Sequence, residues 1–377
     1  MYFCAMSMLD TIPEAIEAIR RGEVIIVVDD EDRENEGDFL IAARHATPEV
    51  VNFMATHGRG LICAPLIEKR CDDLNLGLMV QTNNAAFETP FTVSVDLMGH
   101  GCTTGISAQD RSKTIQALID PKTDPNELGR PGHIFPLRAR AGGVLRRAGH
   151  TEAAIDFSRL AGFEPAGVIV EIMNEDGTMA RLPECRKLAN EHGLKLVSIE
   201  DLIQYRLANE TLIERTLELD IETAFGQFKA IAYRQLTNDV EHLALTLGEW
   251  NETDDVPVRV HSTSMLGDVF QMTGFRKGPE LHAAMKQIQK QGKGAVVYIN
   301  KLREGQSLTD ELKIYKEKRA TPNAKESNTM DSKDYGIGAQ IIRDLGIRRL
   351  HILSDHPRKK GIIGYGLEIT GTTPLSV

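Results

Sequence analysis

Cysteine and long hydrophobic runs are scarce in this 377-residue chain, and their scarcity excludes several classes of protein. The five cysteines form no CxxC pair and end at Cys185, so their pattern predicts neither a disulfide framework nor a cysteine zinc site. No run approaches the ~20 apolar residues that span a bilayer. The opening MYFCAMSM lacks the basic and apolar regions of a secretory signal. We therefore expect a cytoplasmic protein with no membrane partner.

Positive charge is also in deficit, because the formal net charge is −10. Such a chain does not attract nucleic acid over its whole surface, so we expect no nucleic-acid partner and only local sites for anions. The length fits two domains of ~150–200 residues. Apolar strands that alternate with amphipathic helices predict the α/β class, with mixed α+β sheets.

The most unusual stretch is DDEDRENEGD, residues 29–38, with seven carboxylates and one arginine between two apolar runs. Like charges this close repel one another unless a cation is bound, so the stretch predicts a divalent-cation site. The alternative is a solvated acidic loop. An EF-hand that starts at Asp32 fails, because its twelfth position is Ala43 where a glutamate is needed.

Residues that could bind an anion lie further along the chain than the acidic stretch. Arginines are dense in GRPGHIFPLRARAGGVLRRAGHT, residues 129–151, whose glycines and prolines predict mostly loop. Its segment RRAGHT has the parts of a phosphate cradle, although plain surface charge is the alternative. Thr104 precedes a helix predicted to be capped by Ser107, another position that suits an anion. Glu171 lies in the apolar strand GVIVEIM, where it is either ligated or faces water.

Neither a Walker A pattern nor GxGxxG occurs in the sequence. The residues alone therefore predict a site for a small, oxygen-rich phosphate compound chelated by Mg²⁺. Residues 205–225 are expected to connect two units. The polar, turn-rich segment 318–333 is expected to be mobile.

Four motifs, DDEDRENEGD, GCTTGISAQDR, RPGHIFPLRAR and RRAGHTEAAIDFSRLAGFEPAGVIVEI, closely resemble 3,4-dihydroxy-2-butanone 4-phosphate synthase over residues ~8–206. The resemblance implies a riboflavin-biosynthesis enzyme that converts D-ribulose 5-phosphate into L-3,4-dihydroxy-2-butanone 4-phosphate and formate. It also implies a homodimer, two Mg²⁺ or Mn²⁺ ions and no zinc. The metal ligands would be Glu34 and His150, and the catalytic residues His133 and Glu171. The substrate contacts would come from Arg33, Glu34, Asp38, Thr104, Arg147, Gly149, His150, Thr151 and Glu171.

From about residue 225 the chain resembles GTP cyclohydrolase II, through VPVRVHS, GPELHAAM and DYGIGAQIIRDLGI. The expected domains are 1–206 for the synthase and 225–377 for the cyclohydrolase-like unit, with 207–224 as a linker. Ser264, Phe275 and Lys277 stand where that family has zinc-binding cysteines, so no thiolate remains for the metal. Leu302, Arg303 and Glu304 replace its EGR segment, Lys333 replaces its arginine nucleophile, and Asp331 is retained.

These substitutions predict that the second domain is catalytically degenerate and is retained for structure, dimerisation or regulation. Two alternatives remain open. One is a bifunctional enzyme with a different metal site, and the other is a binding module that senses GTP. Arg259, His261 and Lys359 are candidates for phosphate contacts, or they support the fold.

Overall fold

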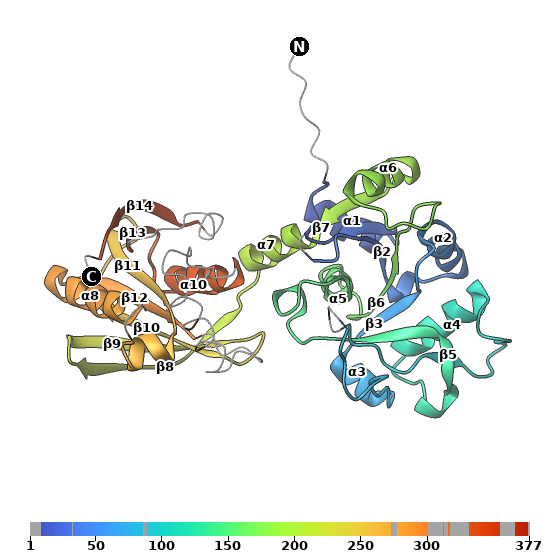
Figure 1. Ribbon diagram of the computed structural model, residues 1–377, viewed down its shortest axis with the longest axis horizontal. Coiled ribbons are helices and arrows are strands. Elements are labelled where there is room, and N and C mark those ends of the chain that lie inside the picture. Colours follow the sequence, from blue (N-terminus) through green and yellow to red (C-terminus); the bar gives the residue numbers. More distant parts are fainter. Residues whose placement is uncertain are drawn as a thin grey trace, which may run out of the picture. The chain divides into compact units, whose positions relative to one another are not determined.

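The chain divides into two compact units, Met1–Arg206 and Leu207–Val377, in the computed structural model (Figure 1). The structure describes residues 9–31, 33–85, 87, 89–272, 277–300, 312, 316, 332–354 and 366–375, and the side chains of all of these except 277 and 332–335. Each unit contains a seven-stranded mixed sheet, which confirms the predicted α/β class.

The sheet of the first unit has the strand order β4-β5-β3-β6-β2-β1-β7. Neighbouring strands are antiparallel, except that β3–β5 and β1–β7 are parallel. Both β1 and β2 are buried along their whole length, because helices cover both faces of the sheet. The strands are β1 (Ile25–Val28), β2 (Gly37–Ala42), β3 (Cys63–Ile67), β4 (Val95–Leu97), β5 (Leu128–Ala139), β6 (Gly167–Glu171) and β7 (Lys195–Ser198).

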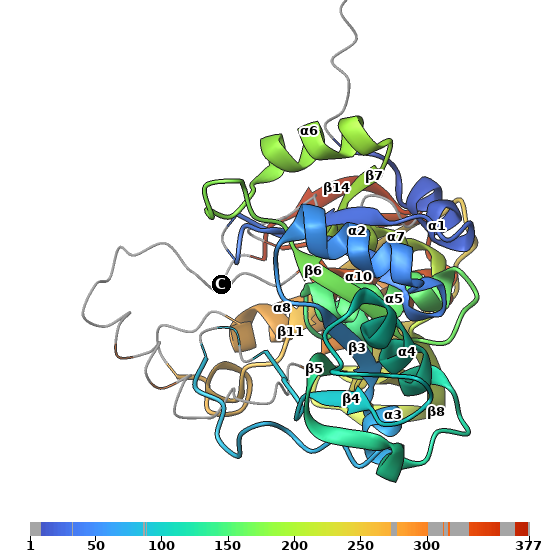
Figure 2. The same cartoon turned by 90° about the vertical axis from the view of Figure 1, so that its right-hand side faces the viewer.

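The helices of the first unit lie in two layers. A continuous core joins one face of the sheet to α2 (Pro48–Gly58), α4 (Ala108–Ile119) and α6 (Leu182–His192). In Figure 2, α2 and α4 lie toward the viewer. On the other face, α5 (His150–Leu160) packs on β2, β3, β5 and β6 and beside α1 (Ile12–Arg20).

Shorter elements complete the first unit. They are α3 (Glu68–Asp73), the start of α7 (Ile199–Asn209), and the 3₁₀ helices Ala43–His45, Pro125–Glu127 and Gly143–Leu145. The predicted cap of α4 is present, because the Ser107 hydroxyl accepts a hydrogen bond from the Asp110 amide (3.0 Å).

The second unit has the strand order β14-β13-β11-β12-β10-β9-β8. Strands β8 to β10 and β12 pair antiparallel, whereas β11 to β14 continue the sheet in parallel. The strands are β8 (Ile213–Thr223), β9 (Gly226–Gln235), β10 (Glu241–Leu247), β11 (Asp255–Ser262), β12 (Gly294–Ile299), β13 (Arg349–Leu353) and β14 (Glu368–Thr373). The helices described are a π-helical turn (Met265–Val269), α8 (Lys277–Gln291) and α10 (Ser332–Asp344).

The expectation of mostly loop over residues 129–151 is wrong. Residues Leu128–Ala139 form β5, which pairs with β4 on one side and β3 on the other. Pairing on both sides, with Ile134 and Leu137 buried, outweighs the turn propensity of the glycines and prolines.

The expected linker 207–224 also differs from the structure, since it holds the end of α7 and all of β8. This long strand pairs with β9 along nearly its whole length, so the segment belongs to the second sheet. Most of the segment 318–333 lies outside the described residues.

Candidate active site

The acidic stretch forms the connection of a hairpin, because β1 and β2 pair antiparallel on either side of it. Asp29 is the first residue of this connection, and its side chain is only 1% exposed. It accepts hydrogen bonds from Arg33 Nη1 (2.7 Å), from the Glu34 amide (3.1 Å) and from the Glu36 amide (2.8 Å). Arg181 donates from outside the hairpin to the carbonyl oxygens of Glu34 and Asn35. Asp29 therefore stabilises the loop from inside it, and Arg181 stabilises it from outside.

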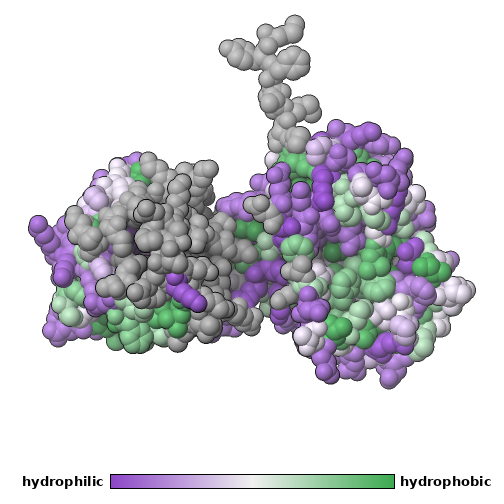
Figure 3. All heavy atoms as spheres, in the orientation of Figure 1, coloured by the Kyte–Doolittle hydropathy of each residue, from purple (hydrophilic) through white to green (hydrophobic). Residues whose placement is uncertain are grey.

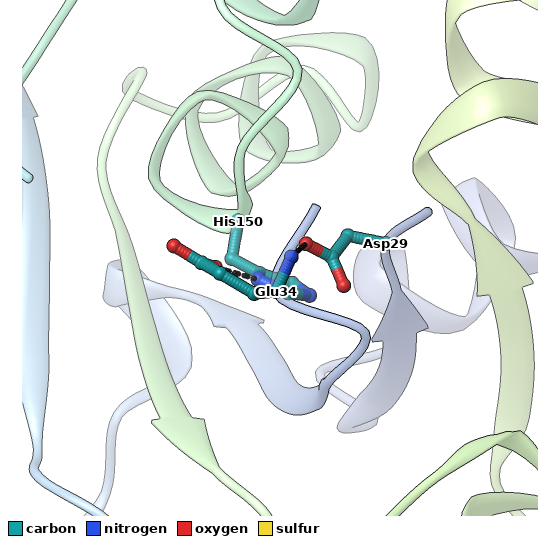
Figure 4. A group of neighbouring side chains, drawn as sticks. All are labelled: Asp29, Glu34 and His150. Carbon is teal, nitrogen blue, oxygen red and sulfur yellow. Dashed lines mark hydrogen bonds and ion pairs between the residues drawn. The ribbon is translucent and has the colours of Figure 1, made fainter. Parts of the chain in front are cut away.

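His150 is the first residue of α5 and points at this loop (Figure 4). Its Nε2 lies 3.1 Å from the Val27 carbonyl oxygen. A carbonyl can only accept, so Nε2 carries the proton. The other nitrogen, Nδ1, lies 3.7 Å from Glu34 Oε2 and 3.8 Å from Asp38 Oδ1. A backbone contact thus orients the ring so that Nδ1 faces two carboxylates.

The charges of this cluster depend strongly on one another. Burial alone would lower the pKa of His150, but the Asp38 and Glu34 carboxylates outweigh it and raise that pKa to about 9. Burial would raise the pKa of Glu34, but His150 and Arg33 lower it to about 2. Burial raises the pKa of Asp38 to about 7, and the Glu171 carboxylate adds to the shift. A proton on His150 therefore occupies the position between carboxylates that a metal cation would take.

The donor atoms fit a divalent cation. Asp29, Glu34 and His150 offer ligand atoms within 4.8 Å of one another. Both Asp29 oxygens already accept hydrogen bonds, so we assign this residue to holding the loop rather than to the cation. Asp38 is 3% exposed, and its Oδ1 lacks a hydrogen-bond partner among the described residues. An unpartnered buried carboxylate oxygen beside Glu34 and His150 completes an oxygen-rich set that suits Mg²⁺ or Mn²⁺.

Glu171 lies beside this cluster, because it pairs with Asp38 across β2 and β6. Directly paired residues project from the same face of a sheet. The Leu61 amide donates to Glu171 Oε2 (2.8 Å), and a Cβ at Gly60 would lie 2.5 Å from that same oxygen. An open hollow of about 520 Å³ adjoins the carboxylate, lined by Glu36, Arg59, Gly60, Leu61, Glu171, Met173 and Met179.

Two guanidinium groups lie at the N-terminus of α5. A Cβ at Gly149 would overlap Arg147 and would lie 3.1 Å from Arg33 Nη2. Arg147 is held there by Glu152 (2.8 Å) and by the Phe87 carbonyl (3.0 Å). The first backbone N–H groups of a helix have no partner within it, and its N-terminus favours negative charge. Together with the buried Thr151, these groups provide donors and positive charge that suit an anion next to His150.

His133 and Thr104 belong to a second cluster. The His133 Nδ1 lies 2.7 Å from Asp96 Oδ2, and Gly105, which follows Thr104, packs directly on the same carboxylate. Among the described residues, no hydrogen bond or ion pair joins this cluster to Glu171. Strand pairing nevertheless places His133 and Glu171 at the same end of the sheet. Phe135 and Ile169 both pair with Cys63. His133 comes two residues before Phe135, and Glu171 comes two residues after Ile169 on a strand that runs the opposite way.

Asp96 and Asp29 were not singled out from the sequence. Asp96 lies in the alternating strand FTVSVDL, where its polar position was the only signal. Its contact with His133 joins residues 37 positions apart. Nothing in the sequence separates Asp29 from Asp30 or Glu31.

Several described polar groups of the second unit contact one another. Ser264, at an expected cysteine position, is buried and accepts a hydrogen bond from the Gly267 amide (3.1 Å). His261 Nε2 and the Tyr298 hydroxyl both contact Asp268 (3.0 and 2.9 Å). Arg259 pairs with Glu280 (2.6 Å).

The other residues expected to matter in the second unit lie outside the described part of the chain. They are Phe275, Leu302, Arg303, Glu304, Asp331 and Lys359, together with the side chains of Lys277 and Lys333. No helix in the described ranges is long and apolar enough to cross a bilayer.

Comparison with known proteins identifies both halves of the chain. The 3,4-dihydroxy-2-butanone 4-phosphate synthase family matches residues 13–205, and the GTP cyclohydrolase II family matches residues 214–374. The riboflavin biosynthesis protein RibBA of Cytophaga hutchinsonii is 56% identical over 98% of this chain and 93% of its own length. The protein of the same name from Bacillus subtilis is 51% identical over 98% and 94%.

Two solved structures are similar as well. RibBX from A. baumannii, described as a two-domain 3,4-dihydroxy-2-butanone 4-phosphate synthase, has a TM-score of 0.78 and 40% identity over 97% of this chain and 99% of its own. A 3,4-dihydroxy-2-butanone 4-phosphate synthase in complex with two magnesium ions covers 52% of this chain and 96% of its own, with 45% identity and a TM-score of 0.50. The chain therefore belongs to the riboflavin-biosynthesis family in which a 3,4-dihydroxy-2-butanone 4-phosphate synthase domain precedes a GTP cyclohydrolase II domain.

Proposed function

We propose that the first unit converts D-ribulose 5-phosphate into L-3,4-dihydroxy-2-butanone 4-phosphate and formate, as a step of riboflavin biosynthesis. One observation carries this proposal. A cation-type cluster of Glu34, Asp38 and His150 adjoins an anion site at the N-terminus of α5, where Arg147 lies over Gly149. A sugar phosphate has both kinds of group, and the family match supports the reaction.

Glu34 and His150 are the proposed ligands of Mg²⁺ or Mn²⁺, with Asp38 close enough to contact a substrate hydroxyl. The complex of a similar synthase with two magnesium ions supports the proposal of two ions. When bound, such ions stabilise negative charge on the oxygens of an enediolate. Arg33, Arg147, Gly149 and Thr151 are proposed to hold the phosphate, with Thr104, which precedes α4, as a further contact.

Glu171 and His133 are the proposed proton-transfer residues. The Leu61 amide holds one oxygen of Glu171, which leaves the other oxygen available to a substrate proton. Asp96 accepts the Nδ1 proton of His133, so Nε2 of that ring is the atom that takes a proton. The reaction removes the C3 proton and one water, shifts the skeleton, and takes one water back as C4 leaves as formate, so it needs groups that both accept and return protons.

The second unit is proposed to lack zinc-dependent GTP cyclohydrolase II activity. The substituted cysteine positions and the internal hydrogen bond of Ser264 support this, because no thiolate is left to hold the metal. The description of the similar A. baumannii protein as a two-domain synthase agrees with it. The name RibBA of other relatives favours the bifunctional alternative, and a GTP-sensing module is a third candidate.

A homodimer is proposed as well. Hydrophobic atoms gather on the face of the first unit that Figure 3 displays. The large exposed hydrophobic residues described in the first unit are Leu61, Leu78, Met79, Val80, Phe87, Met98 and Ile106. Contiguous apolar surface of this kind is typical of interfaces between chains. Sedimentation equilibrium tests the proposal, and a monomer at micromolar concentration would contradict it.

Formate release tests the function of the first unit. Purified full chain with ribulose 5-phosphate should release formate in Mg²⁺, and EDTA should abolish the release. A chain that binds Mg²⁺ but releases no formate would contradict the assignment.

GTP tests the second unit in a parallel reaction with Zn²⁺, read as the pyrimidine product. We expect no turnover, and zinc-dependent turnover would establish the bifunctional alternative. Calorimetry with GTP separates the remaining two roles, since saturable binding without turnover indicates sensing and no binding indicates a scaffold.

A further inference from the structure

Arg206 is a buried arginine near the end of α7 that the proposed reaction does not use. Its side chain is 5% exposed, and Nη1 donates to the Gly142 carbonyl (2.7 Å) and to Asp156 Oδ2 (2.9 Å). Arginine is costly to bury unless its donors are paired. The Arg206–Asp156 ion pair therefore joins α7 to α5, and the hydrogen bond to Gly142 joins α7 to the loop that follows β5.

Asp156 fixes the same loop directly. Its Oδ2 accepts the Val144 amide (2.8 Å), and a Cβ at Gly143 would overlap the carboxylate. Gly143 also has φ +63°, which an L side chain rarely adopts. The loop backbone thus wraps the carboxylate so closely that any shift of Asp156 must shift residues 142–144.

The other end of this loop carries Arg147 of the proposed phosphate site. Glu152, fully buried and one turn before Asp156 on α5, accepts the Arg140 amide (3.1 Å) and Arg147 Nη1 (2.8 Å). Two carboxylates on one face of α5 therefore hold the 140–147 loop at two points. Glu152 contacts the Arg147 guanidinium itself, whereas Asp156 and Arg206 contact the backbone of the loop before Arg147.

We propose that Arg206 is a positioning residue for phosphate binding, which acts through Asp156 and the Gly142 carbonyl to set where Arg147 lies over Gly149. The proposal rests on the function proposed above. Arg206 touches no substrate in this account. Its loss should weaken the hold on the phosphate without removing a group from the metal cluster or from proton transfer.

Steady-state kinetics of the full chain test this with Arg206→Gln, which removes the charge, and Arg206→Lys, which keeps it. Arg159→Gln is the matched control, because Arg159 lies 3.7 Å from the same Asp156 carboxylate but is 43% exposed. We expect Arg206→Gln to raise KM for ribulose 5-phosphate about tenfold while kcat changes less than about threefold. The competitive inhibition constant of inorganic phosphate should rise by the same factor, with Mg²⁺ dependence unchanged. Arg206→Lys should fall between wild type and Arg206→Gln, and the control should match wild type.

A KM and a phosphate inhibition constant at wild-type values in both Arg206 variants would overturn the proposal. A fall in kcat with KM unchanged would also overturn it. If Arg206→Gln does not fold, Arg206→Lys decides on the same criteria. If the wild type releases no formate, the function proposed above fails instead, and calorimetry with inorganic phosphate on the wild type and Arg206→Lys then decides the role of Arg206 separately.

Discussion

Asp29 and Glu34 lie five positions apart in one acidic loop, yet their surroundings give them different tasks. Asp29 accepts three hydrogen bonds from its own loop, whereas Glu34 faces the ring of His150. Residue types alone predicted a cation site here, because crowded carboxylates need a positive partner. They could not predict this division, because it depends on how the hairpin folds back on Asp29.

Replacing Asp29 by asparagine should loosen the loop without removing a metal ligand. Groups that orient ligands typically change metal affinity by about tenfold or more. We expect Asp29→Asn to raise the Mg²⁺ concentration for half-maximal formate release about tenfold, with the rate restored to within about threefold at saturating Mg²⁺. The exposed Glu31→Gln is the control and should match wild type. A rate that stays low at saturating Mg²⁺ would make Asp29 a ligand instead.

Gly60 tests the position of Glu171. A Cβ there would lie 2.5 Å from Glu171 Oε2 and from its backbone oxygen, so Gly60→Ala must displace the carboxylate. We expect kcat to fall about a hundredfold, since small displacements of catalytic groups are costly. Gly77→Ala is the matched control, because nothing lies within 4 Å of its added Cβ. Equal kcat for the two variants would exclude Glu171 from proton transfer.

Among the elements, β5 shows where local propensity fails. Glycine and proline predicted loop for residues 129–151, but pairing with two strands makes Leu128–Ala139 a strand that carries His133 to the edge of the sheet. Long-range pairing is not visible in a single segment. The cap of α4 by Ser107 is a local signal of sequence, and the structure confirms it.

Asp10 joins α1 to β7 and should make the first unit sensitive to acid. Its carboxylate accepts the Leu196 amide (3.0 Å), Arg186 (2.8 Å) and Lys195 (3.1 Å). Burial alone would raise the pKa of Asp10, but these donors outweigh it and hold the pKa below 3.8. Because the folded-state pKa is depressed, the stabilisation is fully present above pH 3.8 and is lost as the pH falls through the lower folded value.

Asp10→Asn should therefore reduce the free energy of unfolding at pH 7 by about 1–2 kcal/mol. The difference from wild type should shrink below pH 3.8. The control is Asp73→Asn in the exposed Lys69–Asp73 pair, which should change stability by less than about 0.5 kcal/mol. Urea titrations at several pH values measure both. A difference that stays constant with pH would show that Asp10 acts through packing rather than charge.

At the scale of the whole molecule, the two units differ in how the polar side chains of their candidate sites are paired. In the first unit, Asp38 Oδ1 is buried without a hydrogen-bond partner among the described residues and lies near His150, whereas His261 and Arg259 of the second unit each pair with a carboxylate. Two domains and two separate sheets could be predicted from length and strand pattern. The boundary between the two units was harder to predict, because α7 (Ile199–Asn209) continues past Arg206 and β8 begins a few residues later.

Gln340 of α10 should influence the first unit through α7. Its amide donates to the carbonyl oxygens of Leu207 (2.9 Å) and Glu210 (2.8 Å) and accepts the Leu212 amide (2.8 Å). These groups end the helix that carries Arg206. We expect Gln340→Ala to raise KM for ribulose 5-phosphate about threefold, in the direction of the Arg206 variants. Gln289→Ala, which removes a similar contact to the Gln227 carbonyl, is the control, and an equal KM for both would contradict the link.

The central claim is that one site, built from the acidic hairpin, the N-terminus of α5 and the end of β6, excises a carbon from a sugar phosphate. Carbon-13 NMR of the full chain with Mg²⁺ and ribulose 5-phosphate labelled at C4 tests it most directly. We expect the label to appear in formate while the four-carbon phosphate product is unlabelled. Label retained in a five-carbon sugar, or found in the four-carbon product, would contradict it.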